Sequence, residues 1–187
     1  MKSLWIAASL SWLTLGLSPM LLADDKGTVV GIDGLSSRTP ESWKEQKPGS
    51  RMQFKVFTLP KVEGDEADAT LTIFFFGPGG GGGVKENITR WKGMFTPPEG
   101  KSIDDVAKVK ELQAGKVKIT LLDVTGTYKS RLQPANPDSP IKEFPNSRML
   151  AVVFESENGP YFMRLVGSEK TVSKHQESFE TWLKNFK

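Results

Sequence analysis

The stretch Leu71-Thr72-Ile73-Phe74-Phe75-Phe76, followed by a glycine-rich loop (77–83) and by residues 84–95, decides the fold. Alternate residues of a strand point to opposite faces of a sheet, and residues 71–76 are apolar on both sides apart from Thr72. Such a strand belongs inside a sheet that is covered on both faces. Apolar residues recur at helical spacing over 84–95, which predicts a helix that covers one face. They are Val84, Ile88, Trp91 and Phe95.

The first 23 residues have the pattern of an export signal. Lys2 precedes an apolar run over residues 4–17, and Leu21-Leu22-Ala23 stands before Asp24. A membrane anchor is the alternative, because residues 4–22 are nearly long enough to cross a bilayer, although polar residues and Pro19 interrupt them. We expect cleavage after Ala23, and hence a periplasmic or extracellular protein in which residues 24–187 form a single domain.

Charge and cysteine content exclude several classes of protein. The chain of 187 residues has a formal net charge of +3; removal of residues 1–23, which contain Lys2 and no acidic residue, leaves a charge of +2. This balance does not indicate a nucleic-acid partner. The chain has no cysteine, which excludes disulfides, thiolate metal sites and a cysteine nucleophile.

The segments before residue 71 predict a loosely held start, one strand and a turn. Residues 24–34 read as a loosely held start. Alternation of apolar and polar residues over 51–60 predicts a strand with a slip of register near Val56. The acidic segment 62–69 reads as a solvated turn rather than a calcium loop, because it lacks the ligand spacing of an EF-hand.

After residue 100, the pattern predicts two hairpins and a helix. The hairpins join 106–112 to 116–125, and 148–155 to 161–166 through Asn158-Gly159. Residues 149–154 are apolar on both faces, so we expect them beside 71–76. Between the hairpins, residues 129–147 read as a long proline-rich loop. The last helix covers 171–186 with Ser168 or Thr171 as its cap, and Trp91 and Trp182 should lie in the core.

In this order, the elements resemble the PsbP-like fold. The resemblance rests on Pro40-x-x-Trp43, on residues 54–60, and on Tyr161-Phe162-Met163-Arg164-Leu165 with the residues that follow. Residues 71–95, with Phe76-Gly77-Pro78-Gly79 and Asn87-Ile88-x-Arg90-Trp91, are similar to an uncharacterised family of exported bacterial proteins. The resemblance implies an α+β fold, a curved antiparallel sheet covered by helices in an α/β/α sandwich. It also implies a role as an assembly factor, extrinsic subunit or partner-binding module, without a catalytic motif.

The glycine loop allows two interpretations. It fits G-x-G-x-x-G, but it lacks the lysine and hydroxyl residue of a P-loop, and hairpins surround it rather than βαβ units, so we do not expect nucleotide binding. Backbone N–H groups at a helix start can bind an anion. The ligand-binding residues would then be Gly79, Gly80, Gly81, Asn87 and Arg90. In the alternative, the loop is a hinge, Asn87 holds it by hydrogen bonds, and Arg90 is solvated.

Two further features have a structural and a functional interpretation. Four lysines on the first hairpin form either a solvated sheet face or a basic patch for an anion. They are Lys108, Lys110, Lys116 and Lys118. His175, the single histidine, lies on the apolar stripe of the last helix and belongs at the border of the core rather than to a metal site or general base.

Taken together, these patterns favour a binding function over catalysis. We expect an exported, non-catalytic binding or assembly-accessory domain with a protein partner, no cofactor, no metal and no membrane anchor after cleavage. The alternatives are a binder of small anions or acidic polysaccharides, and an enzyme whose residues meet only in the folded chain.

The export signal gives a direct prediction. Protein recovered outside the cytoplasm should begin near Asp24, because the small residue Ala23 closes the apolar region. Intact-mass spectrometry measures this. A full-length species that needs detergent for extraction would indicate a retained anchor instead.

Overall fold

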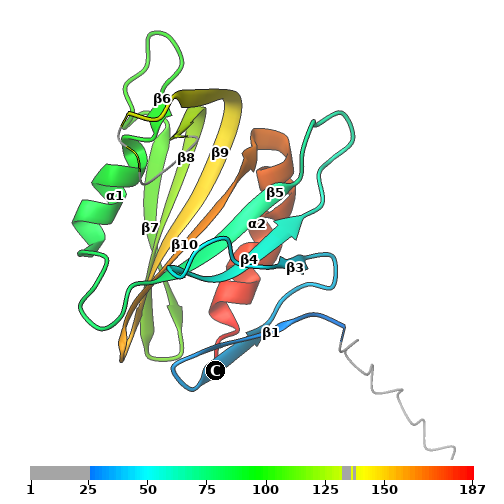
Figure 1. The fold of residues 1–187 in the computed structure, drawn as a ribbon, viewed down its shortest axis with the longest axis vertical. Helices are drawn as coiled ribbons and strands as arrows, with labels where there is room; N and C mark the ends of the chain where they lie inside the picture. The colour runs from blue at the N-terminus through cyan, green and yellow to red at the C-terminus, as the bar shows by residue number, and fades with distance from the viewer. Residues whose placement is uncertain (1–25, 132–135, 137) are drawn as a thin grey trace, which may run out of the picture.

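The structure, a computed structural model, describes residues 26–131, 136 and 138–187 (Figure 1). The expected export signal lies outside these residues. Two helices accompany the strands, α1 (Val84–Lys92) and α2 (Glu169–Lys184). The strands are β1 (Val29–Ile32), β2 (Leu35–Arg38), β3 (Lys44–Gln46), β4 (Gln53–Leu59), β5 (Ala69–Phe75), β6 (Phe95–Thr96), β7 (Ala107–Ala114), β8 (Val117–Arg131), β9 (Ile141–Ser156) and β10 (Gly159–Ser168).

An antiparallel sheet of eight strands forms the body of the molecule. Its order is β3-β4-β5-β10-β9-β8-β6, and β7 pairs with β8. Both expected hairpins are present, as β7–β8 and β9–β10. The prediction that residues 149–154 lie beside the strand 71–76 is wrong, because β10 occupies that edge of β5 and separates it from β9. The expected slip of register in β4 occurs between Gln53 and Lys55.

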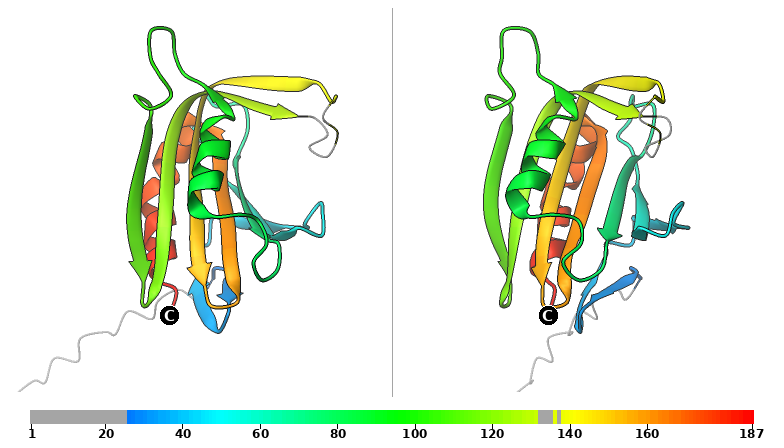
Figure 2. Two further views of the ribbon diagram at one scale, coloured as in Figure 1. Left: turned by 90° about the vertical axis from the view of Figure 1, so that its left-hand side faces the viewer. Right: turned by 60° about the vertical axis from the view of Figure 1, so that its left-hand side comes forward.

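Side chains of the central strands alternate between two hydrophobic clusters, one on each face of the sheet. On β9, Leu150, Val152 and Phe154 belong to the first cluster, and Met149, Ala151 and Val153 to the second. Helix α2 contributes Trp182 to the first cluster, and α1 contributes Trp91 to the second. Both tryptophans are buried, as the sequence predicts. The left view of Figure 2 shows α1 (green) in front of the sheet and α2 (red) behind it. The described residues therefore have an α+β fold, an antiparallel sheet with two helices.

Helix α1 is shorter than the sequence predicts. It ends at Lys92, with Gly93 as its C-cap, and Phe95 lies in β6 opposite Tyr128. Phe95 is still buried in the second cluster, but its position in the sheet accounts for this burial, and not a place on the apolar face of α1.

The start of the described chain is not loosely held, contrary to the sequence prediction. β1 and β2 form a hairpin that buries Val30 and Ile32 in the first cluster. Ser37 Oγ donates a hydrogen bond to the carbonyl of Trp182 at 2.7 Å. The backbone of Lys187 exchanges hydrogen bonds with Ser36, so the last residue closes on this hairpin.

Much of the expected proline-rich loop is strand. β8 continues to Arg131 and β9 begins at Ile141, so only residues 132–140 connect them. A register irregularity between Gly126 and Tyr128 accommodates Pro145 and the positive φ of Asn146. Beyond it, β8 and β9 bend away from the body of the sheet (Figure 2). A Cβ at Gly126 would lie 2.5 Å from the Thr96 carbonyl oxygen, so the bend requires glycine.

The acidic segment 62–69 anchors the start of α2. Ser168 is the N-cap, and its hydroxyl accepts from the Thr171 backbone N–H at 3.2 Å. The Asp65 carboxylate accepts hydrogen bonds from the hydroxyls of Ser168 and Thr171. These bonds hold the pKa of Asp65 below its usual value. One carboxylate of the expected solvated turn is therefore part of the helix cap.

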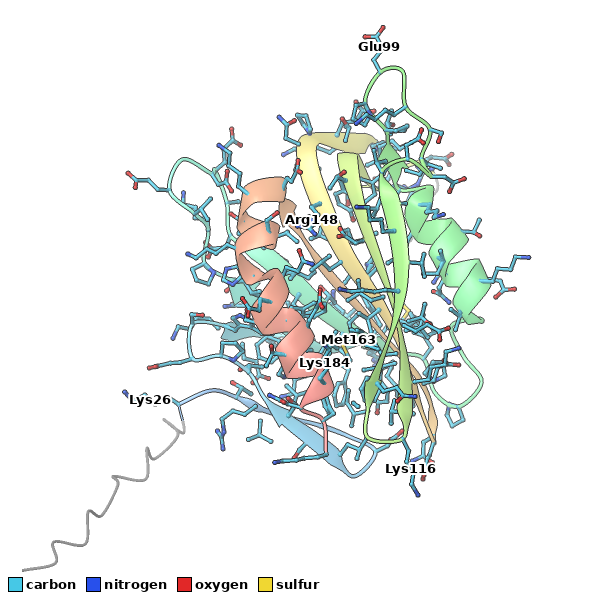
Figure 3. All side chains as sticks on the ribbon, turned by 180° about the vertical axis from the view of Figure 1, so that it is seen from behind. Lys26, Glu99, Lys116, Arg148, Met163 and Lys184 are labelled. Atoms are coloured by element: carbon cyan, nitrogen blue, oxygen red, sulfur yellow. The ribbon has the colours of Figure 1, made fainter. Side chains whose placement is uncertain are left out.

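Arg148 joins α2 to the sheet on the same face. Its guanidinium makes a bidentate pair with Asp123, at 2.8 and 2.6 Å, and donates to Ser173 and Gln176 of α2. Figure 3 shows Arg148 beside the first turns of this helix. The hydrogen bond with Asp123 raises the pKa of Arg148, so this charge is fully compensated.

The Asp65 contact predicts a pH dependence. Because the folded pKa of Asp65 is depressed, its contribution to stability is present above its ordinary pKa of 3.8 and is lost as the pH falls through the lower folded value. Asp65→Asn should lower the free energy of unfolding at pH 7 and reduce the loss on acidification. Urea melts at pH 7 and pH 3 measure both. Glu66→Gln, an exposed neighbour, is the control, and an equal effect in both variants would contradict the role of Asp65.

Candidate binding site

The glycine loop is fixed by its own backbone and by close packing. Gly77, Gly79, Gly81 and Gly82 have positive φ angles, which favour glycine. A Cβ at Gly81 would lie 2.3 Å from the Phe162 ring, and one at Gly80 would lie 2.4 Å from the Phe76 carbonyl oxygen. The loop passes directly over aromatic side chains, which accounts for its glycine content without a bound ligand.

Asn87 holds the loop in place. It is buried, and its side-chain amide donates to the carbonyls of Gly81 and Gly83 at 2.9 and 2.8 Å. Its Oδ1 accepts from the guanidinium of Arg90. Asn87 is therefore not free to face a ligand, and the structure favours the interpretation in which it restrains the loop.

The start of α1 offers little to an anion. Gly83 is the N-cap and has no side-chain cap, and the first turn carries Glu86. A Cβ at Gly83 would lie 2.6 Å from Oε2 of Glu86, so that carboxylate already stands against the helix N-terminus. Its negative charge occupies the position that an incoming anion would need.

The four lysines do not share one surface. Lys110 pairs with Glu180 of α2 at 2.6 Å, and Lys108 lies two residues away on the same side of β7. Lys118 pairs with Glu111 at 2.8 Å on the other side of this hairpin. Lys116 lies at the tip of the hairpin (Figure 3).

An arginine that the sequence reasoning did not single out stands on the α1 side of the sheet. Arg164 of β10 lies opposite Thr72 of β5 and is only partly exposed. Its guanidinium carbon is 4.8 Å from the centre of the Phe74 ring, and Nη1 lies 3.6 Å from Sδ of Met94. The available signal in the sequence was a charged residue within the apolar run 161–166.

Within the described residues, no carboxylate compensates Arg164. No aspartate or glutamate lies within ion-pair distance of Arg164 or Arg90 there. Burial and the positive charge of Arg90 lower the pKa of Arg164, and the Tyr128 hydroxyl partly opposes this. We call Arg90 and Arg164 the arginine pair.

Aromatic rings adjoin the arginine pair. Phe74 and Phe76 stack with centroids 6.1 Å apart, and Phe76 lies 5.7 Å from the buried Phe162. Phe162 in turn meets Trp91 of α1 at 6.4 Å. We call Phe74, Phe76 and Phe162 the aromatic strip. Its outer member, Phe76, is 39% exposed.

Other candidate chemistry is sparse in the part of the chain that the structure describes. His175 is buried, and its Nε2 lies 2.9 Å from the Pro60 carbonyl oxygen, at the border of the core. No group of three or more metal-ligating side chains occurs among the described residues. Within the same residues, neither helix has the length and hydrophobicity needed to cross a bilayer.

Comparison with known proteins agrees with this architecture. No family model and no curated protein sequence matches the chain. Among solved structures, it is similar to the solution structure of cyanobacterial PsbP (CyanoP) from Synechocystis sp. PCC 6803, with a TM-score of 0.51 over 92% of this chain and 98% of that one. The chain has a PsbP-like fold. Sequence identity across the PsbP-like match is 14%, so the likeness shows the fold alone.

The glycine loop gives a matched pair of variants. Gly79→Ala meets no atom within 4 Å and should cost only the strain of a positive φ, about 1–2 kcal/mol. Gly81→Ala carries the same strain and also displaces the Phe162 ring, which should add about 1–3 kcal/mol. Denaturant melts compare the two. Equal losses would show that the loop does not press on the aromatic strip.

Proposed function

We propose that this chain is an exported, non-catalytic accessory domain that binds a protein partner on the α1 side of its sheet. The observation that supports this most is the exposed Phe76, which packs on the buried Phe162 and stacks with Phe74, the ring that Arg164 covers. Aromatic residues and arginine are enriched at protein interfaces, where a few residues carry most of the binding energy.

The sheet leaves this surface open to a partner. Helix α1 packs over β8 and β9. Val56, Thr72 and Phe74, which belong to β4 and β5, remain partly exposed. Strands hold these side chains in fixed positions, so a partner would meet a preformed surface and would lose little free energy to ordering it.

The other elements of the proposal come from the sequence. The pattern of residues 1–23 supports export and cleavage, which would leave residues 24–187 as one domain without a membrane anchor. The PsbP-like fold supports an accessory role, as the resemblance in sequence implied. Binding of an acidic polysaccharide through the four lysines is less favoured, because Lys110 and Lys118 already have acidic partners on different sides of the hairpin.

A photo-crosslinking experiment tests the location of the interface. A benzophenone-bearing phenylalanine in place of Phe76 should form a covalent adduct with one specific protein in the native exporting cell. The same residue in place of Val109, which is 49% exposed on the distant edge strand β7, is the control. Equal adducts at both positions, or none at residue 76, would contradict the proposed surface.

Loss of the Phe76 ring should also weaken binding. Phe76→Ala should reduce affinity for the crosslinked partner about tenfold or more, whereas Val109→Ala should leave it unchanged. Surface plasmon resonance with the identified partner measures both, and thermal melts confirm that both variants fold.

A further inference from the structure

We propose that the arginine pair binds a carboxylate from an acidic segment of the protein partner, and that an apolar residue next to this acid packs on the aromatic strip. The inference rests on the proposed function and adds the chemistry of the partner. It follows from a partly buried positive charge that has no acidic partner among the described residues.

Arg164 is partly buried, yet within the described residues it lacks the partners that a guanidinium removed from water usually has. A buried guanidinium normally has a carboxylate partner or several strong acceptors, because its transfer out of water is costly. Arg164 has a ring face at 4.8 Å and a thioether sulfur at 3.6 Å, both of which are weak partners. A carboxylate from outside the chain would supply the missing acceptor.

Arg148, on the neighbouring strand β9, contrasts with Arg164 in its partners. Arg148 of β9 faces α2 and has a bidentate aspartate, a serine hydroxyl and a glutamine carbonyl as acceptors. Arg164 of β10 faces the opposite side of the sheet and has none of these acceptors among the described residues. One arginine thus completes the fold, whereas the other retains unused N–H donors on the side of the sheet where strands β4 and β5 are partly exposed.

Arg90 places a second positive charge near the first. Its Nη2 donates to Oδ1 of Asn87, and the amide of Asn87 is itself fixed by the carbonyls of Gly81 and Gly83. Arg90 is therefore held on the surface of α1, and its positive charge adds to the burial that lowers the pKa of Arg164. A carboxylate shared by the pair would offset both positive charges.

The surroundings favour a carboxylate on a peptide over a phosphate. Phosphate sites usually add backbone N–H groups or hydroxyl donors to arginine, whereas Phe74 and Met94 line the guanidinium of Arg164. An aromatic surface continues from Phe74 to the exposed Phe76, where an apolar side chain can pack. An acidic residue with an apolar neighbour matches both parts of the site.

The test uses two short peptides that differ only in charge. The first is acetyl-Leu-Glu-Leu-amide, and the second has Gln in place of Glu. Nuclear magnetic resonance follows the arginine Nε–Hε signals of the full-length mature protein. The Glu peptide should shift the signals of Arg164 and Arg90 in a saturable way, and the Gln peptide should bind about tenfold more weakly or worse.

Arg164→Met separates binding from folding. Methionine keeps an unbranched side chain over Phe74 and removes the charge, so the melting temperature should stay the same or rise while Glu-peptide affinity falls about tenfold or more. Arg90→Gln on the exposed helix surface should weaken binding with little effect on folding. Lys116→Met, at the hairpin tip, removes the same charge elsewhere and should change neither quantity.

Three results would overturn the inference. They are equal binding of the Glu and Gln peptides, a lower melting temperature with unchanged binding in Arg164→Met, and saturation of the Arg164 signal by inorganic phosphate at a lower concentration than by the Glu peptide. Capture of the partner by the Arg164→Met variant, together with loss of capture by Phe76→Ala, would leave the proposed function intact. Retention by both variants would reject the proposed surface as well.

Discussion

Strands β9 and β10 pair from Gly159 opposite Ser156 to Ser168 opposite Ser147, and the central side chains of both strands are removed from water on the two faces of the sheet. A strand pair of this kind cannot be stable with one face in solvent, because each exposed apolar side chain would forfeit about 1.5–3 kcal/mol of burial. The two hydrophobic clusters and the two helices follow from this constraint. So does the position of the N-terminal hairpin, which adds Val30 and Ile32 to the cluster beneath α2.

Local patterns were sufficient for much of this architecture, and non-local pairing accounts for the errors. The stripes of α1 and α2 and the burial of Trp91 and Trp182 depend on spacing within one segment, which the sequence displays directly. Which strand pairs with β5 depends on which strand of the β9–β10 hairpin lies next to it. The sequences of β5 and β9 do not specify this by themselves. Phe95 was assigned to a helix because its apolar side chain fitted the stripe, although its burial comes from β6.

The candidate site was harder to predict than the fold for the same reason. Helical geometry placed Asn87 on the flank of α1, but only the path of the glycine loop shows that two carbonyls lie within its reach. Arg164 could be noticed as a charge in an apolar strand. Whether that charge has a partner depends on α1, β5 and β8, which meet it from distant parts of the sequence.

The hairpin of β1 and β2 connects the beginning of the described chain with its end. In β2, the backbone of Ser36 exchanges hydrogen bonds with Lys187, and the hydroxyl of Ser37 donates to the carbonyl of Trp182. The hairpin can therefore reach its final position only after α2 has docked and the residues up to Lys187 are available. A nascent chain on the ribosome would keep Val30, Ile32 and Trp43 exposed until synthesis reached that point. Such delayed closure would suit the export that we propose, because a polypeptide must stay unfolded to pass through a translocon.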